Sequence, residues 1–192
     1  VNGASATFLV ASGAVGGLVN ISCPTITVNS GSFGGTVTFS GANAQSLGGS
    51  VSASFSSLTI NKSANNLTVG ANGASVSGTL TLTNGLISIP SGVFTLGSGA
   101  TVSGGGSESS YVQGAMSKVG ATGTVLFPIG AGHYRPVETS LTGSSPTVQF
   151  QVFDTAPNNS FDDPPIIKIS EIRYWLGTVS YTHLTLPTNR EV

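Results

Sequence analysis

Apolar and polar residues alternate along many short stretches of the chain. In residues 79–83, Leu80 and Leu82 fall on one face and the three threonines fall on the other. Successive side chains of a β-strand point to opposite faces of the sheet, so this alternation predicts strands with one buried face. The same alternation occurs in residues 36–39, 87–89 and 94–96, and no stretch has the period of an amphipathic helix.

Short turns separate the predicted strands. Asn72-Gly73, Asn84-Gly85 and Ser91-Gly92 each follow or precede an alternating stretch. Gly and Asn tolerate the positive φ angles of tight turns. The chain is therefore expected to consist of many short strands joined by small turns.

The combination of strand and turn recurs along the first half of the chain. Segments that begin at Ile26, Leu67 and Phe94 each read apolar-Thr-apolar, continue through a turn, and reach another apolar residue shortly before a glycine. The interval from Leu67 to Phe94 falls within the range of roughly 20–50 residues that is typical of a solenoid repeat. We therefore favour an all-β fold with a parallel β-helix, and an antiparallel sandwich is the alternative because it also has short, evenly spaced strands.

Charged residues divide the chain into two parts. Between residues 1 and 107 the one charged side chain is Lys62, and this stretch has no Asp, Glu, Arg or His. Charges and aromatic residues become more frequent from Glu108 onward. We expect Gly/Ser/Thr-rich β-helical repeats over residues 1–106 and a truncated β-sandwich-like domain over residues 107–178.

The scarcity of charged side chains limits the chemistry that is expected of this chain. Acid–base catalysis uses His, Asp, Glu, Lys, Tyr or Cys, hard cations need carboxylates, and glycoside hydrolysis needs a pair of them. We therefore predict that the chain is not an enzyme and has no cofactor and no metal site. A formal net charge of −1 also gives no basic surface for nucleic acid. No apolar run approaches the roughly 20 residues of a transmembrane helix.

One block in the second part resembles a known junction between domains. Residues 110–120 read Ser-Tyr-Val-Gln-Gly-Ala-Met-Ser-Lys-Val-Gly, and Phe-Pro-Ile-Gly (127–130) and Tyr-Arg-Pro (134–136) follow. This block is similar to one in secreted surface proteins of Gram-negative bacteria that use type IX secretion, where β-helical repeats precede a β-domain. The resemblance implies an adhesin-like repeat protein that is extracellular or at the cell surface. It implies surface polysaccharide or another cell-surface protein as partner, and it supplies no catalytic residues.

The end of the chain resembles a translated sequencing adapter. Residues 179–188 read Val-Ser-Tyr-Thr-His-Leu-Thr-Leu-Pro-Thr, which back-translates to a transposon-end adapter. We therefore exclude residues 179–192 from the fold prediction as an adapter-derived artefact. The sequence is interpreted as a metagenomic fragment whose natural continuation after Thr178, and whose beginning before Val1, are missing.

Tyr134 and Arg135 belong to the densest polar group, together with His133 and Glu138. In a functional interpretation Tyr134 stacks on a sugar and Arg135 donates forked hydrogen bonds to a ligand. In a structural interpretation Arg135 pairs with Glu138 or with a backbone carbonyl. Thr155 lies in an Asp-Thr-Ala sequence that resembles the short O-glycosylation motif of the same bacterial group.

Three classes of function are consistent with the sequence. The working hypothesis is an extracellular structural or adhesive surface protein, in which the β-helix is a stalk. The alternative is a carbohydrate-binding or carbohydrate-processing β-helix protein whose active residues lie outside this chain. A third hypothesis, an ice- or crystal-binding face, rests on the Thr-x-Thr pairs in 25–27, 36–38 and 79–83, whose spacing is too irregular to predict a flat array.

Overall fold

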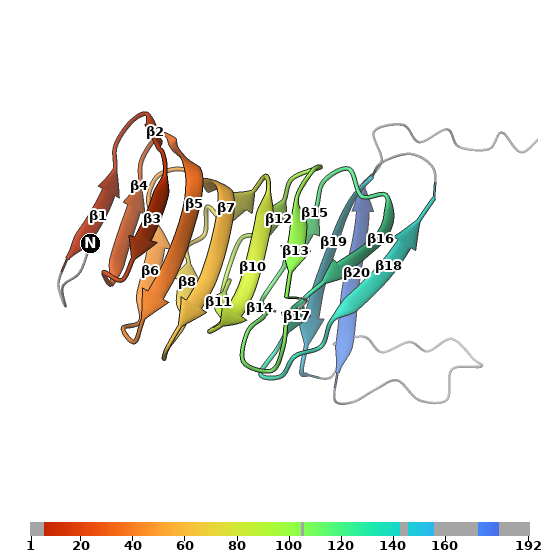
Figure 1. Cartoon of the computed structure of the whole chain (residues 1–192). Coiled ribbons are helices and arrows are strands. Elements are labelled where there is room, and N and C mark those ends of the chain that lie inside the picture. Colours follow the sequence, from red (N-terminus) through yellow and green to blue (C-terminus); the bar gives the residue numbers. More distant parts are fainter. Residues whose placement is uncertain (1–5, 105, 143–145, 156–172, 181–192) are drawn as a thin grey trace, which may run out of the picture.

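The protein folds as a parallel β-solenoid of about six turns, shown in Figure 1. The computed structural model describes residues 6–104, 106–142, 146–155 and 173–180, and none of these residues belongs to a helix. In the first half, all paired strands run parallel to one another. The prediction of an all-β parallel β-helix is therefore confirmed, and the antiparallel alternative for these residues is wrong.

One side of the solenoid is a sheet of seven parallel strands, to which successive coils each contribute one strand. Its inward positions are apolar except for Gln45, and its outward positions are mostly Thr, Ser and Gly. In stacking order the strands are β1 (Thr7–Val10), β4 (Thr25–Val28), β6 (Gln45–Gly48), β8 (Leu67–Val69), β11 (Ile87–Ser88), β14 (Val112–Gln113) and β17 (Ile129–Gly130).

The remaining sides of the coils form a second sheet of eleven strands. Two long strands each pair with two shorter strands of a neighbouring coil: β5 pairs with β2 and β3, and β7 pairs with β9 and β10. The strands are β2 (Ala14–Val15), β3 (Leu18–Ile21), β5 (Ser32–Gly41), β7 (Ala53–Lys62), β9 (Ala74–Val76), β10 (Thr79–Asn84), β12 (Phe94–Leu96), β13 (Thr101–Ser103), β15 (Met116–Lys118), β19 (Thr147–Phe153) and β20 (Tyr174–Ser180).

The coils repeat at a shorter interval than the sequence comparison suggests. Thr25 pairs with Ser46 and Ser46 pairs with Thr68, and both steps along the chain are shorter than the interval from Leu67 to Phe94. That longer interval is not a coil repeat, because β8 and β12 lie in different sheets. The two segments look alike because both sheets bury alternate apolar residues and present Thr between them.

Inward side chains form a continuous core along the solenoid axis. The Phe33 and Phe55 rings stack with their centroids 4.8 Å apart, and Phe39 meets Phe55 edge-on at 6.1 Å. Stacked and edge-to-face rings are favourable geometries for aromatic pairs. Since Phe55 comes from the coil that follows the other two rings, each coil relies on its neighbour to complete its core.

At one corner the coils approach so closely that only glycine fits. Gly49 has a φ angle of 129°, and a Cβ atom there would lie 2.0 Å from the carbonyl oxygen of Val28 in the preceding coil. Both the positive φ angle and the missing space exclude a side chain.

Lys62 and Gln45 form a buried hydrogen-bond network at another corner. Lys62 is 1% exposed, and its Nζ donates to the carbonyl oxygen of Asn43 at 2.8 Å and to Gln45 Oε1 at 2.7 Å. Gln45 Nε2 donates to the carbonyl oxygens of Ile21 and Cys23 at 2.9 and 3.0 Å. Burial lowers the pKa of the Lys62 ammonium. The one charged residue of the first half therefore lies in the interior, where it satisfies oxygens that point away from water.

Both parallel ladders continue past the expected boundary between residues 106 and 107. Ile87 of β11 pairs with Val112 of β14, which pairs with Ile129 of β17. In the other sheet, Phe94 of β12 pairs in parallel with Met116 of β15. The solenoid thus includes the first strands of the segment for which the sequence predicts a β-sandwich-like domain.

Antiparallel strands follow at the far end of the solenoid (Figure 1). β16 (Gly123–Phe127) pairs with β18 (Val137–Leu141) in a separate two-stranded sheet. β19 pairs with β15 and with β20. The first two residues of the expected adapter tail, Val179 and Ser180, end β20, and residues 181–192 lie outside the described part of the chain.

Candidate functional site

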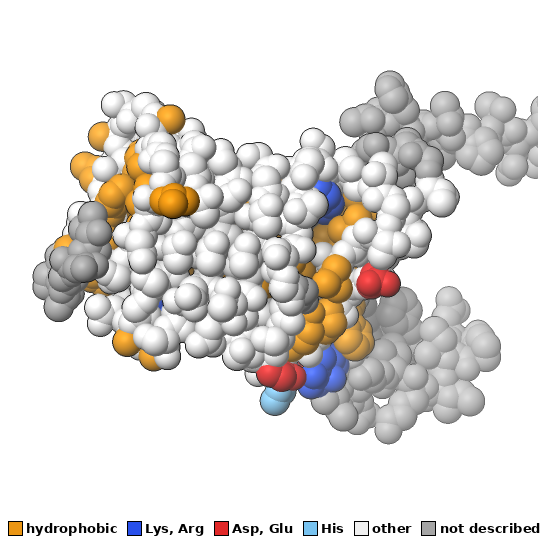
Figure 2. Space-filling view, viewed as in Figure 1, with side chains coloured by type: hydrophobic (Ala, Val, Ile, Leu, Met, Phe, Trp, Pro, Cys, Tyr) orange, Lys and Arg blue, Asp and Glu red, His pale blue; other side chains and the backbone are white. Residues whose placement is uncertain are grey.

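Two rows of polar side chains cover most of the outward face of β3, β5, β7, β10 and β13, and the exposed Leu18 of β3 lies at the end of one of them. Thr38 pairs with Thr59, and Thr59 pairs with Thr81, so one hydroxyl follows another from coil to coil. Neighbouring strands lie about 4.8 Å apart, and residues i and i+2 of a strand are about 6.6 Å apart. The middle of this face is free of hydrophobic and charged side chains in Figure 2. The rows consist of Thr36, Ser57, Thr79 and Thr101, and of Asn20, Thr38, Thr59, Thr81 and Ser103.

The register of the strands explains why the Thr-x-Thr pairs look irregular in the sequence. The turns between strands differ in length, so the interval along the chain varies while the ladder keeps the strands aligned. Thr36–Thr38 and Thr79–Thr81 therefore lie in one array, contrary to the expectation from spacing. The pair Thr25 and Thr27 lies in β4, in the other sheet.

Beside these rows runs a groove of about 300 Å³ lined by hydroxyls. Ser75 Oγ donates to Ser54 Oγ at 3.2 Å, across the pairing of β9 with β7. The rings of Phe33 and Phe55 lie beneath the hydroxyls and also line the groove. The lining hydroxyls are those of Ser32, Ser54, Ser56, Ser75, Ser77 and Thr95. Because hydroxyls both donate and accept hydrogen bonds, the groove is suited to uncharged polar ligands.

A cluster of charged side chains lies at the other end of the described chain, around Glu108. Glu108 sits in a tight turn and its Oε2 accepts a hydrogen bond from the backbone nitrogen of Tyr134 at 3.2 Å. His133 Nδ1 lies 3.6 Å from Glu108 Oε2, and Arg135 Nη1 lies 4.0 Å from Glu108 Oε1. The Glu108 side chain is 65% exposed, so water screens both contacts and each contributes little to stability.

Tyr134 and Arg135 lie together in this cluster, as their sequence positions require, and the Tyr134 ring packs beside the buried ring of Tyr111. The Tyr134 ring is 6.2 Å from the ring of Tyr111, and partial burial raises the pKa of the Tyr134 hydroxyl. Arg135 Nη1 donates to the carbonyl oxygen of Tyr134 at 3.0 Å, while its Nε is buried without a hydrogen-bond partner in the described residues. The carboxylate near Arg135 is that of Glu108. Glu138, which the sequence offered as a partner, lies on β18 and pairs with Leu126.

Burial is also the main reason why the pKa of Tyr111 is raised, and the nearby Glu108 and Asp154 carboxylates raise it further. Tyr111 is therefore neutral at physiological pH and packs as part of the interior rather than acting as a base. Asp154, at the end of β19, accepts a hydrogen bond from Arg173 Nε. Thr155 follows it on the surface, where it is accessible to the predicted O-glycosylation.

The pair of Asp154 and Arg173 predicts how the C-terminal strands respond to acid. The hydrogen bond from Arg173 is the main cause that lowers the pKa of Asp154 below its ordinary value of 3.8. A lowered pKa means that the stabilisation is present above the ordinary value and is lost as the pH falls through the folded-state value. We expect the protection of the β19 and β20 amides, taken relative to their intrinsic exchange rate at each pH, to fall on acidification, and Asp154→Asn to show the lower protection already at neutral pH. Equal protection of these amides in strong acid and at neutral pH, in the wild-type protein, would contradict this expectation.

The described residues contain no group of three His, Cys, Asp or Glu side chains placed to hold a metal ion. Within the same residues no helix has the length and apolar character that a membrane crossing needs. Comparisons with protein families, with curated proteins and with solved structures give no match. The class of the protein is therefore defined by its own fold: it is a parallel β-solenoid protein with a hydroxyl-covered face.

Proposed function

We propose that the chain is a structural module of an extracellular surface protein, in which the β-solenoid forms a stiff stalk with an adhesive surface. The observation that carries this proposal is the distribution of ionisable groups. In residues 6–104 both ionisable side chains, Cys23 and Lys62, are buried, and the surface consists mostly of hydroxyl, amide and backbone groups with a few exposed apolar side chains such as Leu18. A surface of this kind can form many hydrogen bonds but has no acid or base for catalysis.

The solenoid architecture supports the role of a stalk. Each coil contacts its neighbours in sequence, so length increases coil by coil while one core runs through the whole array. The exposed acids and bases gather at the far end in Figure 2, near Glu108 and Arg135. The resemblance of residues 110–136 to secreted surface proteins supports an extracellular location for this arrangement.

Carbohydrate binding is the second candidate function, and the hydroxyl-lined groove favours it. Six hydroxyls line a groove of about 300 Å³ and no charged side chain does. A neutral polysaccharide has matching donors and acceptors along its length. Retention of the chain by neutral polysaccharide without any turnover would support this function and would identify the adhesive contact of the stalk.

Turnover and binding on one panel of polysaccharides test the proposal. The full chain is incubated with neutral and acidic polysaccharides, and new reducing ends are measured alongside retention in polysaccharide gels. A structural module is expected to release no reducing ends above the level of the buffer. Release that is lost in Glu108→Gln or Asp154→Asn, and kept in the control Glu138→Gln, would overturn the proposal in favour of carbohydrate processing.

A further inference from the structure

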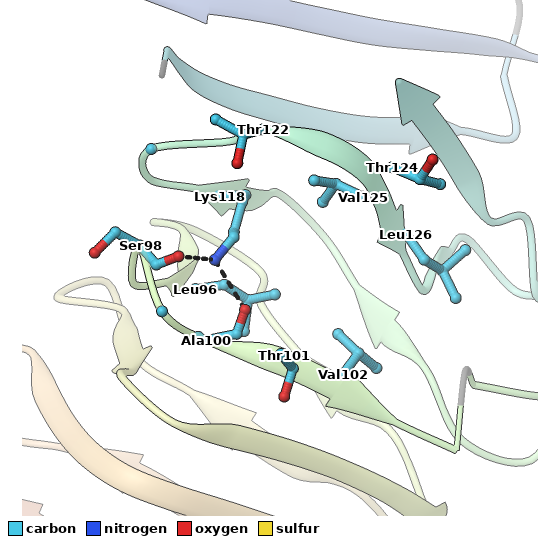
Figure 3. Close-up of a pocket in the computed structure, with 12 residues that line it drawn as sticks. Leu96, Ser98, Ala100, Thr101, Val102, Lys118, Thr122, Thr124, Val125 and Leu126 are labelled. Atoms are coloured by element: carbon cyan, nitrogen blue, oxygen red, sulfur yellow. Dashed lines mark hydrogen bonds between the residues drawn. The ribbon is translucent and has the colours of Figure 1, made fainter. Parts of the chain in front are cut away.

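A cavity of about 370 Å³ lies where the stacking of coils is interrupted, between β13 and β16 (Figure 3). Thr101 and Val102 of β13 line one wall, and Thr124, Val125 and Leu126 of β16 line the other. The cavity is outside the hydroxyl groove and the charged cluster described above.

The position of the cavity follows from the coil repeat. Phe94 of β12 pairs with Met116 of β15 in the next coil. The same interval along the chain, counted from Thr101 at the start of β13, leads to Gly123 at the start of β16. β16 does not pair with β13, however, because it turns away and pairs antiparallel with β18. The cavity therefore occupies the place beside β13 that the next strand of the stack would fill.

Among the residues that the structure describes, no further strand pairs with either wall of the cavity. β13 is the last strand of the eleven-stranded sheet, and β16 has β18 as its single partner among the described residues. The backbone nitrogen of Thr101 donates to the carbonyl oxygen of Gly78, on the β10 side. Alternate residues of a strand direct their backbone groups to opposite sides, so the N–H and C=O of Val102 face the cavity. A free edge of this kind is a template for another strand.

The side chains around the cavity favour an extended peptide over a small anion. Lys118 Nζ donates to the carbonyl oxygens of Ser98 and Ala100, each at 2.8 Å, and to that of Gly97 (Figure 3). All three ammonium protons are thus used, and none remains for an anionic ligand. Apolar side chains line the inner part of the cavity and exposed threonines lie at its mouth, which matches the two faces of an alternating strand. The apolar residues of the inner part include Leu96, Val102 and Val125, the half-buried Leu126 lies beside them, and the threonines are Thr101, Thr122 and Thr124.

We propose that this cavity binds an extended peptide segment of a partner protein, which adds as a strand between β13 and β16. Backbone hydrogen bonds to the edge of β13 provide the affinity, and apolar side chains at alternate positions of the peptide contact Val102 and Val125. Strand addition fills the vacant place in the stack and extends the eleven-stranded sheet by one strand. The proposal does not depend on the function of the whole protein as a stalk.

Binding of a labelled peptide with the sequence Thr-Leu-Thr-Leu-Thr-Asn to the full chain tests the proposal. This is the sequence of β10, the strand that pairs with the other edge of β13. We expect saturable binding by fluorescence anisotropy and at least about tenfold slower exchange of the Val102 amide when the peptide is bound. A peptide with both leucines replaced by proline is expected not to bind, because proline has no N–H to donate.

Two variants locate the binding. Thr124→Lys places a long charged side chain at the mouth of the cavity and is expected to weaken binding at least about tenfold. Thr83→Lys is the control, since Thr83 is exposed on β10 and does not line the cavity. The proposal is overturned if no saturable binding occurs up to about millimolar peptide, or if both variants bind equally. It is also overturned if the chain self-associates through this cavity, with a mass that returns to the monomer value in Thr124→Lys, because the occupant is then a second copy.

Discussion

Replacing Phe55 with alanine is expected to lower the free energy of unfolding by about 3–5 kcal/mol. Phe55 is 2% exposed, its ring stacks on that of Phe33, and it meets Phe39 edge-on. Removal of the ring loses its transfer free energy, leaves a cavity, and breaks two aromatic contacts. Because the three rings come from the neighbouring strands β5 and β7, the loss weakens the attachment of one coil to the next. Chemical denaturation of the full chain, followed by circular dichroism, measures the effect.

Two control variants separate packing from a general effect of substitution. Phe55→Leu keeps most of the buried volume and is expected to cost clearly less than Phe55→Ala. Leu18→Ala removes a side chain that is 89% exposed, so its effect should remain within about 0.5 kcal/mol. A loss below about 1 kcal/mol in Phe55→Ala would show that the ring is not part of the core.

Replacing Lys62 with methionine is expected to destabilise the solenoid by about 2–4 kcal/mol. Methionine fills a similar volume but cannot donate to the Asn43 carbonyl oxygen or to Gln45 Oε1. Each buried acceptor that is left without a partner costs about 1–3 kcal/mol. Relief from burying the ammonium offsets part of this cost, because burial disfavours the charged form and lowers the pKa of Lys62. The shift in the denaturation midpoint measures the net effect.

Asn61→Met is the matched control for Lys62→Met. Asn61 precedes Lys62 in β7 and is exposed, so the same methionine there is expected to change the free energy of unfolding by less than about 0.5 kcal/mol. The double variant Lys62→Met with Gln45→Leu should lose less than the sum of the two single variants, because both members of the pair are then apolar. An Lys62→Met protein as stable as the wild type would contradict the assigned role of the ammonium.

The alternation of apolar and polar residues was sufficient to predict strands and a solenoid, but not the pairing of the coils. The interval along the chain between paired residues is clearly shorter from Thr7 to Thr25 than from Ile87 to Val112. A fixed period therefore cannot be found in the sequence. The sequence did not predict the aligned hydroxyl rows for this reason. Turns of different lengths separate the paired strands, so the rows can be recognised only when the strand pairing is known.

The burial of Lys62 had a signal in the sequence. Leu58, Ile60 and Lys62 occupy alternate positions of β7, so the pattern places all three on the inward face. A lysine is ordinarily exposed to solvent at the surface. Lys62 is buried because its ammonium donates hydrogen bonds to oxygens at the corner of the coil, and the sequence does not show where these oxygens lie. The partners of Arg135 had no such signal, because Glu108 is distant in the sequence and is brought close by the stacking of β14 and β17.

The distance between coils tests the central claim, that the first half is a solenoid of coils stacked in register. Leu18 and Thr101 lie on one outward row, four strand steps apart through Thr36, Ser57 and Thr79. At about 4.8 Å a step, their backbones are roughly 19 Å apart. The chain for this measurement carries Cys23→Ala and spin labels at Leu18→Cys and Thr101→Cys. Double electron–electron resonance between the two labels is predicted to give one distance distribution centred at about 20 Å. Several separate distances, or one distribution centred at more than one and a half times the predicted distance, would contradict the stacked solenoid.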